Sequence, residues 1–485
     1  MSTCSGVAKK FGDGREVTVT VARAEQAGGA FTWICEAALA QRGYYEPHIH
    51  TAMTANSKDR SAQPADLPPG TEAAVRARHE PSRHEQVLDE AARQLNQKGV
   101  LLTSLAEIAA KLGVTRGAMY HYVADREDLV FQCYRRAAEI IARHLREAER
   151  SGGNSAQVLA NFIDRMLDPT EPEIAARAEI AMMNQAQRDT IQGLYDGLAA
   201  RLAHLLETGY RQGVLRACDI EVNARVILSL VTWAPLAKPW ASTLESMTTE
   251  RLRAAVMTTV FDGLSSTRSH LPNYRPLDLS ALAPQAVSAF DRDAATAAKR
   301  EALLRVASRS FNRKGIDATS LDEIAAQLGT TKRTFHHHIG SKQDVVSACY
   351  ERAFRIFLFI KDRMLEYSGT RIEALASSMD ALSRAYPNEE LNPLSPLVGH
   401  GALSPEGQAR FVLLSDELAK AYHELMRQGA LEGSMQESDV QARSLMLPGL
   451  LSWLVKDDVP TDPIQQQHIA REIANFVAVG LKSST

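Results

Sequence analysis

Apolar residues recur every three or four positions along most of the chain, which is the spacing of amphipathic helices. Within Glu85–Gln97 they fall on one helical face, at Val87, Leu88, Ala91, Ala92 and Leu95. Gly99 follows at a position where helices commonly end. Ser104 and Glu107 then have the spacing of a capping box, which predicts the start of another helix.

A helix-turn-helix is predicted at this point. The first of its two short helices follows Ser104, and Gly113 can adopt the left-handed conformation that ends it. Thr115 is placed to cap the second helix, Arg116–Tyr122. Two short helices joined by a turn that contains glycine are the signature of this motif. A long fourth helix, capped by Asp125, is expected to follow.

The same pattern occurs twice in the chain. When the chain is aligned with itself, Glu85–Ala137 matches Glu301–Ala353 without a gap, and 24 of 53 positions are identical. The shared core reads T-S-L-x-E-I-A-A-x-L-G-x-T. With the same offset, "YRQGVLR" at 210–216 aligns with "MRQGALE" at 426–432. We therefore expect that a whole unit was duplicated, and not the helix-turn-helix alone.

The expected fold class is all-α, with two tandem units. Each unit joins a three-helix DNA-binding head to a helical body, to which the family resemblance given below assigns effector binding and dimerisation. Residues 1–80 are expected to form a partly disordered region without an assigned role. The other expected borders are 81–140 for the first head, 141–266 for the first body, 267–291 for a linker, 292–356 for the second head and 357–485 for the second body.

The second helix of such a motif enters the major groove with its N-terminal residues first. Hydroxyl, imidazole and guanidinium groups can reach phosphates or bases there, and small residues let the backbone approach the duplex. In the first head the candidate DNA-binding residues are Ser104, Thr115, Arg116, Gly117, Ala118, Tyr120, His121 and Arg126. In the second head they are Ser320, Thr331, Lys332, Arg333, Thr334, His336, His337 and Lys342.

The stretch Gly113–Leu129, "GVTRGAMYHYVADREDL", resembles the pattern of the tetracycline-repressor (TetR/AcrR) family. The resemblance covers the heads of both units closely and the bodies only in architecture. It implies a dimeric transcriptional repressor whose bodies bind small apolar effectors and then release operator DNA. The second head departs from the pattern, because His336 stands at the place of Tyr120 and Arg333 replaces a small residue. The two heads are therefore expected to read different base sequences.

Methionine adapts its shape and tryptophan offers a large apolar face, so both suit a pocket for an apolar effector. The candidate pocket residues are Met182, Met183, Trp233, Trp240 and Trp453. Ordinary core packing is the competing interpretation of these five. The stripe of Leu194, Leu198, Leu202, Leu206 and Tyr210 predicts a long helix that lies in the core or in a dimer bundle.

Charge and chemistry narrow the function classes. The net charge is −3, so any basic surface for DNA must be local. Five cysteines without a C-x-x-C pair, and no apolar run long enough for a membrane span, favour a reduced cytoplasmic protein. Three consecutive histidines, 336–338, cannot converge on one ion from a helix, so no metal is expected. No catalytic motif is found, so neither an enzyme nor a cofactor is expected.

The sequence leaves two questions open. The two bodies can pair within one chain as a pseudo-dimer, or two chains can form a homodimer that carries four heads. One or both heads can also have lost DNA binding, which would make the chain a helical sensor or interaction protein. A sequence-independent DNA binder would need a more basic face than Arg116, Arg126, Lys332 and Lys342 supply.

Overall fold

The computed structural model describes residues 6–10, 16–20, 81–177, 180–241, 247–283, 291–316, 318–329, 340–396, 403–457 and 459–483. The chain divides into two compact units, Met1–Arg78 and His79–Thr485. In the N-terminal unit, β1 (Gly6–Lys10) pairs antiparallel with β2 (Glu16–Thr20). The disorder expected for the rest of 1–80 lies outside the described residues. All described elements of the larger unit are helices, as the apolar periodicity predicts.

The first head contains the predicted three helices, with two local differences. It consists of α3 (Arg83–Leu102), α4 (Leu105–Lys111) and α5 (Arg116–Met119). Helix α3 continues to Leu102 across a kink at Gly99, where φ is +76°. The expected capping box at Ser104 is only half formed. The Ser104 hydroxyl accepts from the backbone of Glu107, but the Glu107 carboxylate binds Lys98 at 2.6 Å instead of turning back.

The first body begins where the head ends, because one helix serves both. Its helices are α6 (Arg126–Arg150), α7 (Ser155–Met166), η1 (Ile180–Met182), α8 (Gln185–Arg211), α9 (Ile220–Ala241) and α10 (Thr249–Phe261). Near its middle α6 holds the head through Arg136, which pairs with Asp89 of α3 at 2.5 Å. Near its end Glu149 binds Arg201 of α8.

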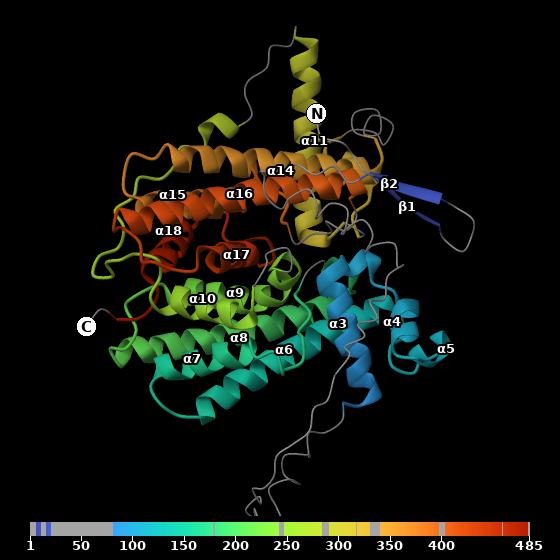
Figure 1. Ribbon diagram of the computed structural model, residues 1–485, viewed down its shortest axis with the longest axis horizontal. Coiled ribbons are helices and arrows are strands. Elements are labelled where there is room, and N and C mark those ends of the chain that lie inside the picture. Colours follow the sequence, from blue (N-terminus) through green and yellow to red (C-terminus); the bar gives the residue numbers. More distant parts are fainter. Residues whose placement is uncertain are drawn as a thin grey trace, which may run out of the picture. The chain divides into compact units, whose positions relative to one another are not determined.

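The second copy repeats this order. The elements are η2 (Ser280–Leu282), α11 (Arg292–Lys314), α12 (Leu321–Gln327), α14 (Lys342–Leu365), α15 (Arg371–Ala385), α16 (Pro405–Leu431), α17 (Val440–Leu451), η4 (Ser452–Val455) and α18 (Pro463–Val479). In Figure 1 the orange and red helices of the second body lie above the green helices of the first. The long helix α11 projects from the top of this arrangement.

The register of the repeat changes between heads and bodies, which corrects one sequence alignment. Helices α4 and α12 begin at Leu105 and Leu321, the positions that the alignment pairs. The same alignment pairs Gly213, the left-handed glycine after α8, with Gly429, but Gly429 lies inside α16. The left-handed glycine after α16 is Gly433, about one helical turn further along. Such a shift keeps the same helical face inward, so the core tolerates it.

The two bodies pack against each other through a reciprocal interface. The end of each body forms backbone hydrogen bonds with the other one. Leu264 N donates to Val477 O at 3.0 Å, and Leu481 N donates to Val260 O at 2.8 Å. The loops that follow α8 and α16 also form backbone hydrogen bonds with the end of the other body. Arg216 N donates to Leu481 O, and Gln436 N donates to Leu264 O. Each of these hydrogen bonds thus has a counterpart with the two bodies exchanged, as in the isologous interface of a twofold dimer.

Two glycines allow the backbones to cross at this interface. Gly263 follows α10 with φ +66°, and Gly480 follows α18 with φ +61°. A Cβ on Gly263 would lie 2.5 Å from Val479 N, and a Cβ on Gly480 would lie 2.5 Å from Phe261 C. Neither position has room for a side chain, so the approach of the two bodies depends on glycine at both.

Ion pairs repeat the same reciprocity on the rim. Arg251 of α10 binds Asp439, the N-cap of α17, at 2.6 Å. His468 of α18 binds Asp219, just before α9, at 2.8 Å. The Arg251 guanidinium is the main cause that lowers the pKa of Asp439. These pairs lie near the surface, where each contributes at most about 1 kcal/mol, so the backbone contacts and the apolar core hold the bodies together.

The connector between the copies is ordered where it is described. Tyr274 and Leu277 are buried against the second body. Ser377 of α15 donates to the carbonyl of Arg275 at 2.7 Å, and Arg384 donates to the carbonyl of Leu277 at 2.9 Å. Its first part, residues 267–283, is therefore a strap along α15 and not a free tether.

Candidate nucleic-acid interface

The outward face of α5 is supported from behind by buried residues of the first head. Met119 and Val123 point into the core with Ile108 of α4, and each is at most 2% exposed. Thr115 caps α5 and accepts a hydrogen bond from Ala118 N at 3.1 Å. Gly113 has φ +66°, so the turn between α4 and α5 is the sharp one that the sequence predicts.

A polar brace that sequence reasoning missed fixes the turn that follows α5. The ring of Tyr122 stacks on His84 of α3, with ring centroids 6.3 Å apart. Gln132 of α6 binds His84 at 2.8 Å and donates to the carbonyl of Tyr122 at 3.2 Å. The three residues come from separate parts of the head, so no local pattern in the sequence reveals that they meet.

The candidate residues of the first head lie on the solvent side of this frame. Thr115, Arg116, Gly117, Tyr120, His121 and Arg126 are exposed, and Ala118 and Ser104 are half-buried. Tyr120 is 49% exposed, which is unusual for so large an aromatic side chain. Helix α5 is shorter than expected and ends at Met119, so Tyr120 and His121 lie on the turn that follows. One surface thus combines hydroxyl, imidazole and guanidinium donors with a small-residue backbone.

A helix N-terminus lies at the same edge. Helix α6 begins at Arg126, and Asp125 caps it by accepting from Asp128 N at 2.8 Å. Asp128 in turn accepts from Ala124 N at 2.8 Å, which fixes the short segment between α5 and α6. The partial positive charge of such an end favours an anion such as phosphate.

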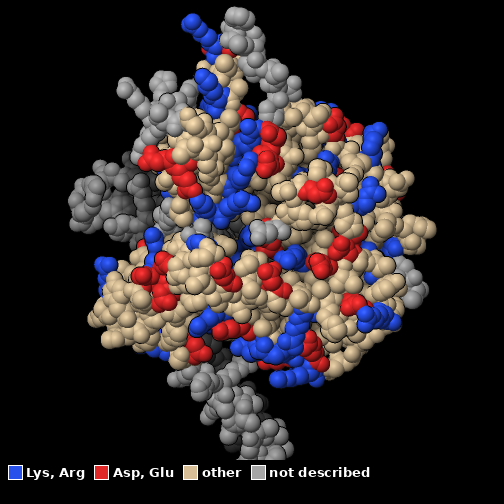
Figure 2. Space-filling view, turned by 180° about the vertical axis from the view of Figure 1, so that it is seen from behind, with Lys and Arg blue, Asp and Glu red and all other residues tan. Residues whose placement is uncertain are grey.

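Charge on the molecule is mixed, as the net charge predicts. Figure 2 shows basic and acidic side chains interspersed over most of one face, with basic side chains gathered along and below the projecting end of α11. In the first head, Lys98 pairs with Glu107, and Lys111 pairs with the buried Glu90 at 3.1 Å. These lysines are thus partly neutralised, so the basic candidates of this head are those at and just after α5.

The second head has the same start. Ser320 caps α12 and accepts from Glu323 N at 3.0 Å, and Lys314 pairs with Glu323 as Lys98 does with Glu107. Gly329 has φ +59°, the counterpart of Gly113. Lys342 is the first residue of α14. The remaining candidates of this head lie outside the described residues: Thr331, Lys332, Arg333, Thr334, His336 and His337.

The five candidate pocket residues do not line one cavity in the described structure. Met183 and Trp233 are buried, and the Trp233 indole donates to the carbonyl of Leu445 in the second body at 2.7 Å. Trp233 therefore packs between the bodies. Met182 packs beside the core, and the side chain of Trp240 lies outside the described part. Trp453 lines a cavity together with charged residues that sequence reasoning missed.

Comparison with known proteins gives consistent matches. The family described as "Bacterial regulatory proteins, tetR family" matches residues 87–133 and 303–349. The chain is 31% identical over 137 residues to the HTH-type transcriptional regulator AcrR of Shigella flexneri, a match that covers 25% of the chain and 64% of AcrR. It is 24% identical over 190 residues to the HTH-type transcriptional repressor KstR2 of Rhodococcus jostii, covering 38% of the chain and 92% of that protein.

A solved structure is also similar to part of the chain. The TetR family regulator PfmR from Thermus thermophilus is 26% identical, with a TM-score of 0.33, over 37% of this chain and 95% of PfmR.

Among the described helices, none has the length and apolar character to span a membrane. The described residues also contain no group of three or more His, Cys, Asp or Glu side chains placed to hold a metal.

Proposed function

Because this chain belongs to the tetR family of bacterial regulatory proteins and carries the family's N-terminal domain twice, we propose that it is a single-chain repressor with two unlike DNA-binding heads. The observation that carries the proposal is the exposed face of Thr115–His121, braced from behind by Met119 and the His84–Tyr122 stack. A face with this chemistry, on a helix-turn-helix, suits the major groove of an operator.

In this proposal Arg116 and Thr115 reach phosphates or base edges, and Gly117 and Ala118 allow the backbone to approach. Tyr120 and His121 donate to phosphate oxygens, and the start of α6 at Arg126 holds a further phosphate. Ser104 and its counterpart Ser320 lie at the starts of α4 and α12 near the backbone of the duplex. These roles are proposed from exposure and chemistry.

The reciprocal interface supports a pseudo-dimer within one chain. Each body already uses the surface that it would need for a second copy of this chain, because Gly263 and Gly480 cross inside the molecule. In this pseudo-dimer the heads are residues 81–140 and 292–356, the bodies are residues 141–266 and 357–485, and residues 267–291 link the two copies. Two heads related by a pseudo-twofold axis would each bind one half-site of the operator. Since the second head has "TKRTFHHHIG" where the first has "TRGAMYHYVA", the half-sites should differ in sequence.

We further propose that a small, largely apolar effector releases the DNA. The route for such a signal is α6, which is tied to the head by Arg136–Asp89 and to the body by Glu149–Arg201. A change in the body that tilts this helix would move α5 relative to the second head. The residues proposed to contact the effector are Met182, Met183, Trp233, Trp240 and Trp453.

Light scattering on the full chain, free and with operator, tests the pseudo-dimer. We expect a free particle of one chain, near 53.2 kDa, that binds one operator duplex as a single chain. The operator is first identified by selecting bound fragments from a random DNA library. A stable two-chain particle that alone binds DNA would refute the single-chain proposal. Selection that yields no preferred sequence would refute the operator itself and would favour a sensor without DNA binding.

Arg116→Ala should weaken operator binding and lower the slope of log affinity against log salt by about one unit. The reason is that one cation–phosphate contact releases about one counterion. Arg126→Ala should behave in the same way. The matched control is Arg211→Ala, since Arg211 is an exposed arginine at the far end of α8 that pairs with Glu207. Fluorescence anisotropy at several salt concentrations measures both quantities. If Arg116→Ala binds as tightly as the Arg211→Ala control, the first head is not the docking head.

A further inference from the structure

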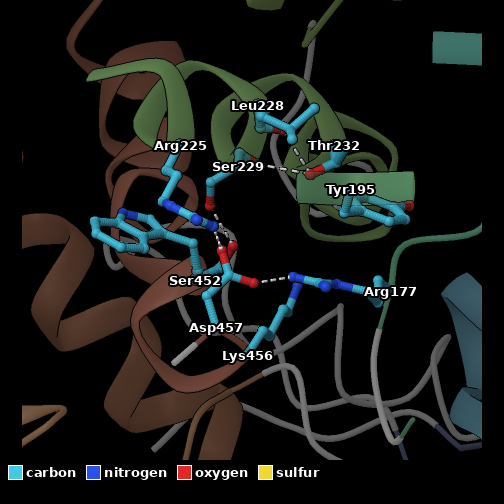
Figure 3. Close-up of a pocket in the computed structure, with 10 residues that line it drawn as sticks. Arg177, Tyr195, Arg225, Leu228, Ser229, Thr232, Ser452, Lys456 and Asp457 are labelled. Carbon is cyan, nitrogen blue, oxygen red and sulfur yellow. Dashed lines mark hydrogen bonds and ion pairs between the residues drawn. The ribbon is translucent and has the colours of Figure 1, made fainter. Parts of the chain in front are cut away.

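A small cavity lies between the two bodies and is lined by charged residues from separate segments. Arg177 precedes η1, Arg225 lies on α9, and Lys456 and Asp457 follow η4 of the second body. In Figure 3 the Lys456 side chain runs toward the place where Arg177 meets Asp457. The space open to the centre of a water-sized sphere is about 20 Å³, which is room for one small group.

The ion pairs around the cavity leave positive charge in excess. Asp457 binds Arg177 and also Arg225, the latter at 2.9 Å. Arg225 reaches a second carboxylate, Asp196 of α8, at 3.3 Å on its other side. Lys456 has no side-chain hydrogen bond or ion pair with any described residue. Three cations therefore share the cavity with a single carboxylate that faces it.

Two further donors at the cavity lack acceptors. The hydroxyl of Tyr195 and the indole nitrogen of Trp453 are buried, and within the described part of the chain neither has a hydrogen-bond partner. Tyr195 is 5% exposed and Trp453 is 6% exposed, so bulk water does not satisfy them. A buried donor without an acceptor costs about 1–3 kcal/mol, and several around one cavity indicate a missing acceptor.

We propose that this cavity binds the carboxylate group of a small organic acid, held by Lys456 and neutralised by the excess of cations around it. The carboxylate supplies acceptors only, which is what the cavity lacks. Leu228 and the Trp453 ring at the same cavity give the apolar part of such an acid a surface to lie on. Binding needs neither DNA nor release of DNA, so it stands apart from the proposed repressor function.

The sequence provides this site once per chain. When α9 and α17 are aligned on their first residues, Ile220 and Val440, Leu236 and Ala237 stand in place of Lys456 and Asp457. When the ends of α8 and α16 are aligned, α16 has a serine where α8 has its cavity tyrosine. The symmetry-related position thus has neither the aspartate nor the tyrosine, and we expect one acid per chain.

Binding should depend on pH through Lys456. Burial, with the nearby Arg177 guanidinium, lowers the pKa of Lys456 to about 7, and Asp457 opposes this only in part. Tyr195, which lines the same cavity, does not titrate near neutral pH, because burial raises the pKa of its hydroxyl to about 12. The acid should therefore bind about tenfold more tightly at pH 6 than at pH 8.5.

Calorimetric titration of the full chain with sodium acetate, in low-salt buffer at pH 6, tests the proposal. Acetamide, which has the same shape without the charge, is the matched ligand. We expect saturable binding of one acetate per chain, no binding of acetamide, and a loss of at least about tenfold in affinity in Lys456→Met. The control variant is Lys420→Met, because Lys420 is exposed on α16 and pairs with Asp416.

Three results would each overturn the proposal. They are equal binding of acetate and acetamide, equal acetate affinity in Lys456→Met and in the wild type, and an affinity that does not change between pH 6 and pH 8.5. The pH comparison uses the wild-type chain, so it decides the question even if a variant fails to fold.

Discussion

Replacing Gly263 with alanine should reduce the free energy of unfolding by about 3 kcal/mol, from two causes. A left-handed φ costs a residue with a Cβ about 1–2 kcal/mol. The methyl group adds a collision with the backbone of Ala478 and Val479, and overpacking of this kind typically costs a further ~1–3 kcal/mol. Urea denaturation of the full chain, followed by circular dichroism, measures the change.

The chain supplies a matched control for this substitution. Gly213 has a similar φ of +71°, but a Cβ there would meet nothing within 4 Å. Gly213→Ala should therefore lose only the backbone contribution of about 1–2 kcal/mol. The difference between the two variants isolates the close crossing of the bodies. Equal destabilisation by both would mean that the bodies do not approach each other in solution as they do here.

Replacing Lys456 with methionine should stabilise the protein, and most strongly below pH 7. The pKa of Lys456 is about 7 in the folded chain, against 10.5 for an ordinary lysine. Below pH 7 the amine is charged in both states, and the folded state bears the cost of a charge that is partly removed from water, since Lys456 is half-buried. Between pH 7 and 10.5 the folded state loses a proton that the unfolded state keeps, so wild-type stability rises with pH over this window.

Methionine removes this cost while it keeps an apolar stem of similar length. The gain in melting temperature should be largest at pH 6, smaller at pH 9 and close to nothing above about pH 10.5. Scanning calorimetry in low-salt buffer without carboxylates measures it, and Lys420→Met should show no such trend. A variant that melts below the wild type at pH 6 would show that the Lys456 ammonium has a stabilising partner.

The head was predictable because its signals are local. Capping residues such as Thr115 and Asp125 and a left-handed glycine such as Gly113 act within about one helical turn of sequence, and the structure has all three in the expected roles. The apolar spacing also marked the correct buried face, including Val87 and Leu88. The exposure of the candidate residues on α5 followed from the same periodicity.

The contacts between the bodies were not predictable, because they join residues that lie far apart in the chain. Gly263 and Gly480 are ordinary helix-ending glycines in the sequence, and only the fold shows that they cross. The downstream alignment failed because a shift of one helical turn preserves the apolar pattern, so "RQG" matched in the wrong register. The cation cluster escaped notice because its members come from separate segments.

The strap at residues 267–283 and the crossing of the two bodies have a consequence for how the protein responds to dilution. An ordinary two-subunit repressor dissociates as its level falls, so its occupancy of an operator drops with the square of the concentration. In the single-chain repressor proposed above, the partner is covalently attached and cannot be lost or exchanged. Occupancy of the operator should then fall only in proportion to the number of chains, so few copies per cell would suffice. The two halves of the protein would also not exchange with subunits of a related repressor.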